Sequence, residues 1–394
     1  MEDAGRFWLK NVRLSDGRAV DIEISDGTFG SIGAAPRDAA AVDGRGWLCL
    51  PALIEGHVHL DKTFLGSPWY SFAGGKTVPD RIREEKLVRS RLEVSVEQRA
   101  ALLVEREIAA GAGYLRTHVD IDADWKLANL EAVMAIRERY RDAIDIEIVA
   151  FPQSGILSSP GTEQLLDAAM TSGADLIGGL DPASIDGDPV RHLDIVFGLA
   201  ERHGKPVDIH LHEGGQLGLF TLALIAERTK ALGLSRRVTV SHAYCLADAS
   251  DQEFGRIGVL LAEADISILS SAPEVRMPPV RKLRQAGVTV FLGSDNVRDA
   301  WSPFGNGDML ERAAIAARQQ VLVEDDELAL AFELVSTAAA EATGRSDYGI
   351  APARAADFLL IDAANLAEAV AAHPPERVTY KRGRKVGQGG SPRG

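Results

Sequence analysis

The sequence predicts an α/β protein: a distorted (β/α)8 TIM barrel plus a small β-sandwich domain formed by the N- and C-terminal segments. Two observations carry this prediction. Through the middle of the chain, eight short apolar segments alternate with segments of helical periodicity, and eight successive βα units indicate a closed parallel barrel. Before and after that series lie short alternating segments bounded by turn residues, a pattern typical of antiparallel strands.

The eight apolar segments have the length of buried strands. Helices cover the strands of such a barrel, so the strands are expected to be almost continuously apolar. With the helices between them, these segments place the barrel in residues 51–344. The expected strands are residues 50–57, 114–120, 146–153, 175–182, 206–213, 238–244, 266–273 and 288–296.

Helix-end signals support the intervening helices. Ser95 and Gln98 form a capping-box pattern ahead of an amphipathic run. Pro189 opens another segment and Gly204 closes it, which are the positions that favour proline and glycine. A further helix is expected over 327–343.

Both ends of the chain contribute to the small domain. Asp-Gly turns separate the segments near the start and predict hairpins, and the same alternating style resumes near the end. Residues 1–50 and 345–394 are therefore expected to form one domain that is split in the sequence. Its expected strands are residues 7–9 with 12–14, 20–24, 28–32, 357–361 and 377–380.

The composition limits the classes of partner. Hydrophobic residues make up 46% and charged residues 25% of the 394 residues, the balance of a globular protein with a large core. The net charge of −14 offers no basic stripe for phosphates, which argues against nucleic acid. A small-molecule substrate is expected instead. Barrels of this size often assemble, so a homo-oligomer is a further expectation, although no apolar stripe locates an interface.

Location is also inferred from composition. The chain contains neither a leader pattern nor a span of 18 apolar residues, so no membrane partner is expected. Cys49 and Cys245 lie in apolar segments without metal or redox spacing, which predicts no disulfide and a reducing compartment. The expected location is cytoplasmic.

Reactive side chains follow the expected strands, at the ends where such barrels hold their active sites. Most of the nine histidines are among them, whereas His192 and His203 lie in helical segments. The strand-end residues are His57 and His59, His118 and Asp120, Gln153, His210 with His212 and Glu213, His242, and Asp295 with Asn296.

His57 and His59 begin the candidate metal site. Residues i and i+2 of a strand face the same side, so two imidazoles can hold one ion. His210 and Asp295 would complete three nitrogens and one carboxylate oxygen, a set that suits one divalent ion, zinc or ferrous iron, and leaves room for water. A lone strand-end histidine is more often structural, as His118 could be, but that explanation is poor for the whole set.

These motifs resemble the amidohydrolase superfamily, and more narrowly its cytosine deaminase branch. The resemblance runs across the barrel, and its most branch-specific motif is 148–156. No lysine ends the segment 175–182, where binuclear members carry a bridging carbamylated lysine, so the resemblance implies a mononuclear site. The other carriers are residues 51–63, 116–120, 208–213, 241–242 and 293–296.

The resemblance also implies roles for individual residues. His57, His59, His210 and Asp295 match the metal ligands, Glu213 the proton shuttle, His242 the histidine beside the metal-bound water, and Gln153 the amide that reads the substrate.

General chemistry agrees with these roles. A divalent ion lowers the pKa of a bound water to about 7. Glu213, three residues beyond His210, could pass the water proton to a leaving nitrogen, with Asp295 and His242 holding the water. Gln153 offers both a donor and an acceptor to a ring edge. The plainer explanations are a solvated carboxylate for Glu213 and a loop-capping amide for Gln153.

Further residues are expected near the substrate. Trp301 and Trp69 could wall a flat pocket, although aromatic residues are more often core. His212, Asn296 and His118 are the remaining candidates for substrate binding. Similar cytosine deaminases carry His-Asp-Asp and Cys-Asp where this chain has residues 294–296 and 211–212, so cytosine itself is not expected to be the best substrate.

The predicted activity is hydrolytic deamination of a small cyclic amidine of the cytosine, isocytosine or creatinine type, with release of ammonia. The alternatives are removal of a substituted amine from an s-triazine of the N-alkylammelide type, ring opening of a cyclic amide, and a catalytically silent barrel that acts as a binding module. The complete set of candidate ligands argues against the silent barrel.

Overall fold

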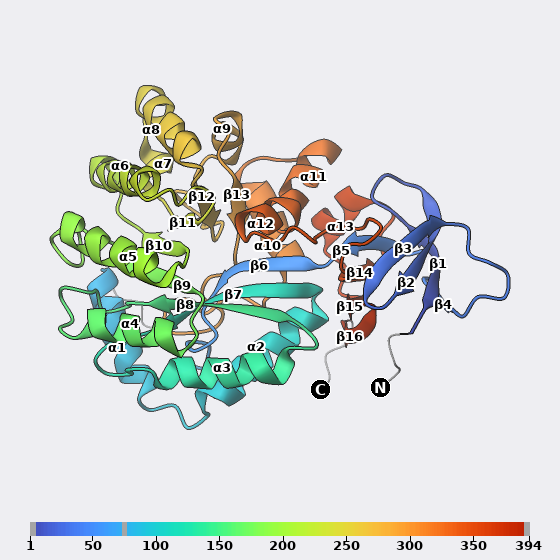
Figure 1. The fold of residues 1–394 in the computed structure, drawn as a ribbon, viewed down its shortest axis with the longest axis horizontal. Helices are drawn as coiled ribbons and strands as arrows, with labels where there is room; N and C mark the ends of the chain where they lie inside the picture. Colours follow the sequence, from blue (N-terminus) through green and yellow to red (C-terminus); the bar gives the residue numbers. More distant parts are fainter. Residues whose placement is uncertain (1–4, 73–76, 390–394) are drawn as a thin grey trace.

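Eight parallel strands form the barrel in the computed structural model, which describes residues 5–72 and 77–389 (Figure 1). The strands lie side by side in the order in which they occur in the chain, as predicted. They are β6 (Leu53–Val58), β7 (Ala112–Asp120), β8 (Asp145–Phe151), β9 (Leu176–Leu180), β10 (Val207–Leu211), β11 (Val238–His242), β12 (Ser267–Ser270) and β13 (Val290–Leu292).

The first and last strands close the barrel. Val58 forms a parallel bridge with Asp295, and the Asp295 amide donates to the His57 carbonyl oxygen at 2.7 Å. Gly293 permits this approach, because a Cβ atom there would lie 2.5 Å from the Cβ of His57. Closure therefore brings two predicted ligands together.

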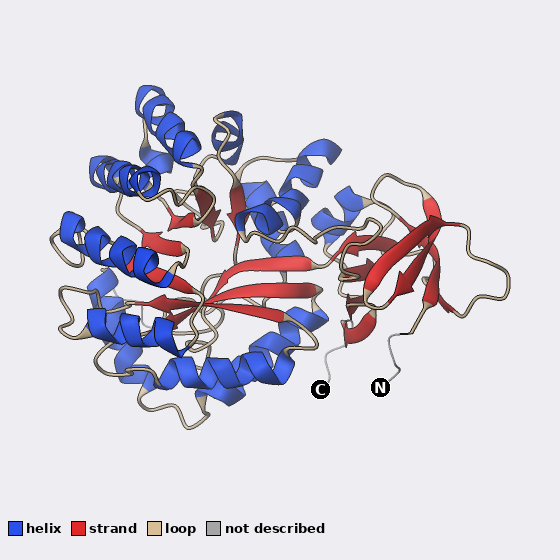
Figure 2. Ribbon diagram, viewed as in Figure 1, coloured by secondary structure: helices blue, strands red, loops and turns tan. Residues whose placement is uncertain are grey.

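Helices cover the outside of the barrel (Figure 2). The predicted ends are confirmed for two of them: Ser95 and Gln98 form the capping box of α2, and Gly204 ends α5 with a φ of +62°. The surrounding helices are α2 (Val96–Ala109), α3 (Ala128–Tyr140), α4 (Thr162–Ser172), α5 (Pro189–His203), α6 (Gly215–Ala231), α7 (Cys245–Asp248), α8 (Asp251–Ala264), α9 (Val280–Gln285) and α10 (Met309–Gln319), and α1 (Val78–Arg89) follows the loop after β6. In the described parts of the chain, no helix is both long and apolar enough to span a bilayer.

The helix expected over 327–343 is wrong as a single element. The structure has α11 (Asp325–Glu333) and α12 (Thr337–Ala342) instead. In the break between them, the Leu334 carbonyl accepts from Leu292 and the Val335 carbonyl accepts from Ile54, at 3.0 and 2.9 Å. The break thus supplies acceptors to the last and first barrel strands, a tertiary demand that local periodicity does not encode.

The terminal segments form a second sheet, in the order β16-β15-β14-β5-β1-β2-β3, with β4 paired to β1. The rings of Phe29 on β3 and Phe358 on β14, which have three strands between them in that order, lie 5.7 Å apart. The sheet therefore curls, and its two halves face each other as in the predicted sandwich. Its strands are β1 (Phe7–Arg13), β2 (Ala19–Ser25), β3 (Thr28–Gly33), β4 (Ala41–Asp43), β5 (Leu48–Pro51), β14 (Phe358–Ile361), β15 (Arg377–Lys381) and β16 (Arg384–Gln388), with α13 (Leu366–Ala372) between β14 and β15.

One strand boundary in this region was predicted wrongly. The segment 50–57 is not one barrel strand, because Leu50 and Pro51 belong to β5 of the terminal sheet and the barrel strand begins at Leu53. Between them, the Ala52 amide donates to the Asp357 carbonyl oxygen at 3.1 Å. One apolar run therefore serves both sheets, and a hydrophobicity pattern alone does not show where it changes sheet.

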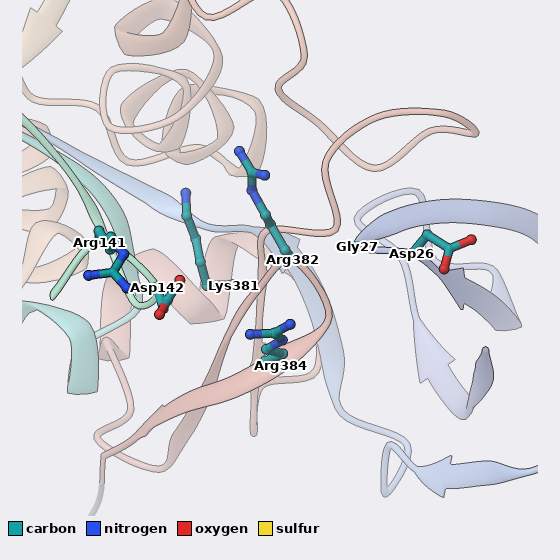
Figure 3. Close-up of a pocket in the computed structure, with 7 residues that line it drawn as sticks. All are labelled: Asp26, Gly27, Arg141, Asp142, Lys381, Arg382 and Arg384. Atoms are coloured by element: carbon teal, nitrogen blue, oxygen red, sulfur yellow. The ribbon is translucent and has the colours of Figure 1, made fainter. Parts of the chain in front are cut away.

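The junction between the two sheets is rich in buried ion pairs. The Arg377 side chain is 1% exposed and donates to both carboxylate oxygens of Asp308 at 2.7 and 2.8 Å. Lys381 pairs with Asp145 at 2.8 Å and with Asp357 at 2.6 Å. A cavity of about 530 Å³ opens beside this junction, at the start of β8 and so at the opposite strand ends from the histidines (Figure 3).

Candidate active site

The predicted metal ligands converge at the carboxyl ends of the barrel strands. The ligand atoms of His57, His59 and Asp295 lie within 4.8 Å of one another, and so do those of His57, His210 and His242. Asp295 Oδ1 is 3.4 Å from His59 Nε2 and 3.7 Å from His57 Nε2. Since His57 belongs to both groups, the five side chains surround one region.

Several ring nitrogens in this cluster have no partner. Among the described residues, no hydrogen bond reaches His57 Nε2 or either ring nitrogen of His210 and His242, although all of these atoms are buried. Burial keeps the pKa of His57 and of His210 well below the ordinary histidine value, so each ring is neutral and keeps a lone pair. Buried polar atoms are rarely left unsatisfied. A divalent cation would satisfy one nitrogen each of His57 and His210.

Asp295 supplies the charge that such a cation needs. Burial alone would raise its pKa, but the contact with His59 and the neighbouring His242 and His57 hold the pKa well below its usual range. Asp295 and His242 also have left-handed backbones, with φ of +60° and +74°. Strain of this kind in non-glycine residues is typical of functional sites.

Contacts on the far side of two rings fix which nitrogen faces the cluster. Ser241 Oγ donates to Asp208 Oδ1 at 2.7 Å, so its oxygen accepts from Nδ1–H of His57 at 3.0 Å. His59 Nδ1 lies 3.1 Å from the His118 carbonyl oxygen, which can only accept. Both rings therefore turn Nε2 toward Asp295, the arrangement usual for metal-binding histidines.

His118, a candidate for substrate binding, lies against the ligand cluster. It is fully buried, stacks on His57 with ring centroids 3.9 Å apart, and places Nε2 at 3.7 Å from Asp208 Oδ2. The structure thus groups His118 with the ligand cluster rather than with the rim.

Glu213 is fixed at the rim by four donors. Its Oε1 accepts from the amides of Ala183 and Ser184 at 2.8 Å each and from the Ser184 hydroxyl at 3.3 Å. Its Oε2 accepts from Thr221 Oγ1 at 2.7 Å. The side chain is therefore a buried, oriented carboxylate rather than a solvated one.

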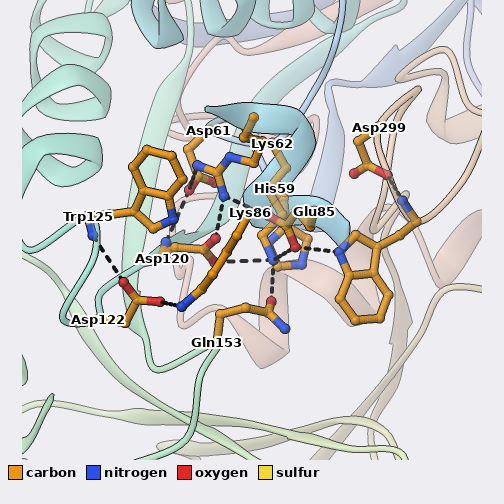
Figure 4. A network of polar contacts seen from close by, with 12 residues as sticks. His59, Asp61, Lys62, Glu85, Lys86, Asp120, Asp122, Trp125, Gln153 and Asp299 are labelled. Carbon is orange, nitrogen blue, oxygen red and sulfur yellow. Dashed lines mark hydrogen bonds and ion pairs between the residues drawn. The ribbon is translucent and has the colours of Figure 1, made fainter. Parts of the chain in front are cut away.

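Lys62 is a buried cation beside the cluster (Figure 4). Its Nζ donates to Gln153 Oε1 and lies 3.1 Å from Asp120 Oδ1 and 3.7 Å from Glu85 Oε2. An ammonium can only donate, so it selects the carbonyl end of the Gln153 amide. The NH2 group of Gln153 is left to face elsewhere.

Aromatic rings stand on one side of this region. Phe151 stacks on His210 with centroids 4.1 Å apart, and Lys62 Nζ lies 5.3 Å from the Phe151 ring centre and 5.8 Å from that of Trp301. Trp69 is 65% exposed and lies under Arg298. Trp69 is therefore a surface residue here and not the second wall expected beside Trp301.

Two of the residues that depart from the cytosine deaminase pattern, His212 and Asn296, have carboxylate partners. His212 Nδ1 donates to Asp181 Oδ2 at 2.8 Å, and this pair raises the pKa of His212 although burial opposes it. Asn296 Nδ2 donates to Asp299 Oδ2 at 2.6 Å. His212 also stacks on His242 at 4.4 Å, which brings it to the edge of the cluster.

Comparison with known proteins decides the family. The model described as "Amidohydrolase family" matches residues 93–386, most of the chain. This protein belongs to the amidohydrolase family. The resemblance found in its motifs is thereby confirmed, and the chain is a hydrolase of that family.

Individual amidohydrolases are similar over nearly the whole chain. N-isopropylammelide isopropylaminohydrolase from Burkholderia multivorans ATCC 17616 has a TM-score of 0.94 and 43% identity, covering 98% of this chain and 99% of that one. 5-methylcytosine deaminase from Klebsiella pneumoniae, liganded with 5-fluorocytosine, has a TM-score of 0.88 and 28% identity, covering 98% of both chains. N-isopropylammelide isopropyl amidohydrolase from Pseudomonas sp. (strain ADP) is 31% identical, covering 88% of this chain and 87% of that protein.

Sequence reasoning missed several residues of this amidohydrolase site. Lys62 follows His59 by three positions, but lysines are mostly exposed, so the sequence alone does not mark it as a buried site residue. Asp181 directly follows β9 and could have been read as a strand-end residue, as could Phe151 at the end of β8. Nothing local marks Glu85, which reaches the site from α1.

Proposed function

We propose that this amidohydrolase removes an amine by hydrolysis from a small nitrogen-rich ring that carries carbonyl groups, an s-triazine of the N-alkylammelide type. The observation that carries the proposal is the cluster of unpartnered neutral ring nitrogens around the ionised Asp295. The choice of ring is supported by the 43% identity to N-isopropylammelide isopropylaminohydrolase. It was the first alternative in the prediction from sequence.

A single divalent ion, zinc or ferrous iron, would be held by His57, His59, His210 and Asp295. When bound, such an ion lowers the pKa of a coordinated water to about 7. His242 is the proposed neighbour of that water, and two observations support this role: its Nδ1 is 3.9 Å from Asp295 Oδ2, and burial, with His212 nearby, lowers its pKa to about 3. His242 therefore acts as a neutral hydrogen-bonding group.

Glu213 is the proposed proton carrier. It takes a proton from the attacking water and delivers it to the exocyclic nitrogen, so that the C–N bond breaks and the amine leaves neutral. The amides of residues 183–184 and the Thr221 hydroxyl orient the carboxylate for proton transfer. The ring carbon keeps the oxygen as a hydroxyl, which becomes a carbonyl when its proton passes to the adjacent ring nitrogen.

The ring would bind against a donor-rich edge. Because Lys62 occupies Gln153 Oε1, the amide can offer its NH2 group, and these two residues together favour ring carbonyl oxygens. His212, whose pKa Asp181 raises, offers a further donor. A triazine with ring carbonyls has more acceptors for such an edge than cytosine, which has one carbonyl.

A second candidate is deamination of a cytosine-type ring, the activity first predicted from sequence. The similarity to 5-methylcytosine deaminase, with a TM-score of 0.88, supports it. The two reactions share the proposed ion and proton carrier, and they differ in the product: an alkylamine from the triazine and ammonia from the pyrimidine.

The test is a substrate panel with the metal-loaded protein. N-isopropylammelide, cytosine, 5-methylcytosine, isocytosine and creatinine are offered, and alkylamine and ammonia are measured separately. Fastest turnover of N-isopropylammelide with isopropylamine release supports the proposal, whereas ammonia release from a pyrimidine alone favours the second candidate. Turnover of none would favour the silent barrel.

The Glu213→Gln variant tests the proton carrier within the same panel. We expect turnover to fall at least about a hundredfold while the metal content stays at the wild-type level. Glu227→Gln, an exposed position on α6, is the matched control. Normal turnover by Glu213→Gln would show that another group carries the proton.

A further inference from the structure

We propose that Glu85, on α1, is a positioning residue for ring binding: it holds Trp301 in place as a wall of the pocket and thereby sets which rings the site accepts. This inference rests on the proposed function. It goes beyond that function because it assigns a specificity role to a helix that supplies none of the proposed ligands or proton carriers.

The contacts of Glu85 tie α1 to the loop after β13. The side chain is 2% exposed, and its Oε2 accepts from the Trp301 indole Nε1–H at 2.5 Å. Its Oε1 accepts from Arg89 at 2.7 Å, one helical turn further along α1. A hydrogen bond to a buried charge is stronger than one between neutral groups, so the indole has one favoured orientation.

The Glu85 carboxylate is kept ionised by its neighbours. Burial alone would raise its pKa, but Lys62 and Arg89, together with the hydrogen bond from Trp301, lower it to about 2. Lys62 Nζ is 3.7 Å from Glu85 Oε2. The same carboxylate therefore faces both the proposed aromatic wall and the cation that orients Gln153.

Apolar packing places α1 over the barrel mouth. Ile82, one turn before Glu85, clusters with Phe151 and Leu180, the last residues of β8 and β9, and Trp301 packs against this cluster. Phe151 in turn stacks on His210. A shift of α1 or of the indole would consequently change the space above the ligand cluster.

Other contacts hold the backbone of Trp301, and the ring itself lies under Lys62 and Arg81, each 5.8 Å from its centre. The Trp301 amide donates to Asp299 Oδ1 at 2.7 Å, and its carbonyl oxygen accepts from Arg81 at 3.3 Å. Without Glu85 the loop would stay anchored while the indole N–H lost its acceptor. The indole then loses the hydrogen bond that favours one orientation, and the remaining ring contacts do not direct its N–H. A change in its orientation alters ring binding and leaves the ligand cluster intact.

The experiment compares Glu85→Leu and Glu85→Gln with Glu84→Gln. Glutamine keeps an acceptor for the indole and loses the charge, whereas leucine loses both. Glu84, the residue before Glu85 on α1, accepts from the Tyr70 hydroxyl at 2.6 Å and serves as the matched control. Kinetics with the best substrate of the panel, metal content, and the indole resonances of ¹⁵N-tryptophan protein are measured, with the Trp301 signal assigned from Trp301→Phe.

We expect KM to rise at least about tenfold in Glu85→Leu and about threefold in Glu85→Gln. In both variants kcat stays within about threefold and metal content is unchanged. The Trp301 resonance should move in both variants and stay in place in Glu84→Gln. A wild-type KM in Glu85→Leu would overturn the proposal, as would a wild-type KM in Glu85→Gln if the leucine variant failed to fold.

Failure of the proposed function gives a different result. If the wild-type protein turned over no ring of the panel, the substrate assignment would fall, and the Trp301 resonance would still decide the positioning role. An unmoved resonance in Glu85→Leu would then refute it.

Discussion

The mouth of the barrel and its junction with the terminal sheet treat buried polar groups in opposite ways. At the junction, the guanidinium of Arg377 reaches Asp308 and the carbonyl oxygens of residues 110, 373 and 374. At the mouth, ring nitrogens of His57, His210 and His242 are buried without partners among the described residues. Buried polar groups that are hydrogen-bonded stabilise a fold, whereas a buried polar group without a partner needs an explanation, such as a ligand that binds there. The buried polar groups at the junction therefore stabilise the fold, whereas those at the mouth are available to bind a ligand.

The largest effect that tests this contrast is expected at the mouth. Asp295→Ala removes the anionic ligand, so we expect loss of stoichiometric metal and a fall in turnover of at least about a thousandfold. Metal analysis and kinetics with the best substrate measure this. His203→Ala on the outer face of α5, where the ring pairs with Asp167, should change neither quantity. Full metal loading of Asp295→Ala would remove this residue from the ligand set.

At the junction the expected effect is on stability alone. Arg377→Met leaves the Asp308 carboxylate and three carbonyl oxygens short of a donor, and breaking a buried pair in this way costs about 3–5 kcal/mol. Denaturant unfolding measures the loss, and kcat of the folded variant should remain normal. Arg384→Met, at an exposed position of the adjacent strand, is the control. If Arg377→Met lowered kcat as much as Asp295→Ala does, the junction would not be a purely structural region.

A smaller, pH-dependent effect would sharpen the comparison. Burial would raise the pKa of Asp145, but Lys381 and Arg345 lower it below the ordinary 3.8. A lowered acid pKa gives stability that is present above 3.8 and is lost as the pH falls through the lowered value. Asp145→Asn should therefore be less stable at pH 7 and show a shallower stability loss below pH 3.8 than wild type. Asp142→Asn, an exposed neighbour, should match wild type.

Sequence reasoning succeeded where one local pattern decides the outcome. The βα alternation gave the barrel, and strand-end chemistry gave His57, His59, His210 and Asp295, which the structure brings together. Their roles as ligands remain a prediction. The rule that parallel strands share a rim made this possible without any knowledge of loops.

It failed where a distant part of the chain sets the requirement. The break at 334–336 provides hydrogen-bond acceptors to strands that are distant in the sequence. Glu85 contacts Lys62 and Trp301, which are also distant from it in the sequence. Trp69 and Trp301 looked alike in sequence, and only tertiary packing distinguishes the exposed one.

The bridge between Val58 and Asp295 has a consequence for biosynthesis. His57 and Asp295 stand at opposite ends of the barrel segment, so a growing polypeptide carries the paired imidazoles long before the aspartate leaves the ribosome. An ion held by all of them can be captured only after the eighth strand has been made and has docked on the first. Metal binding would then occur only in chains whose eighth strand has been synthesised and whose barrel has closed.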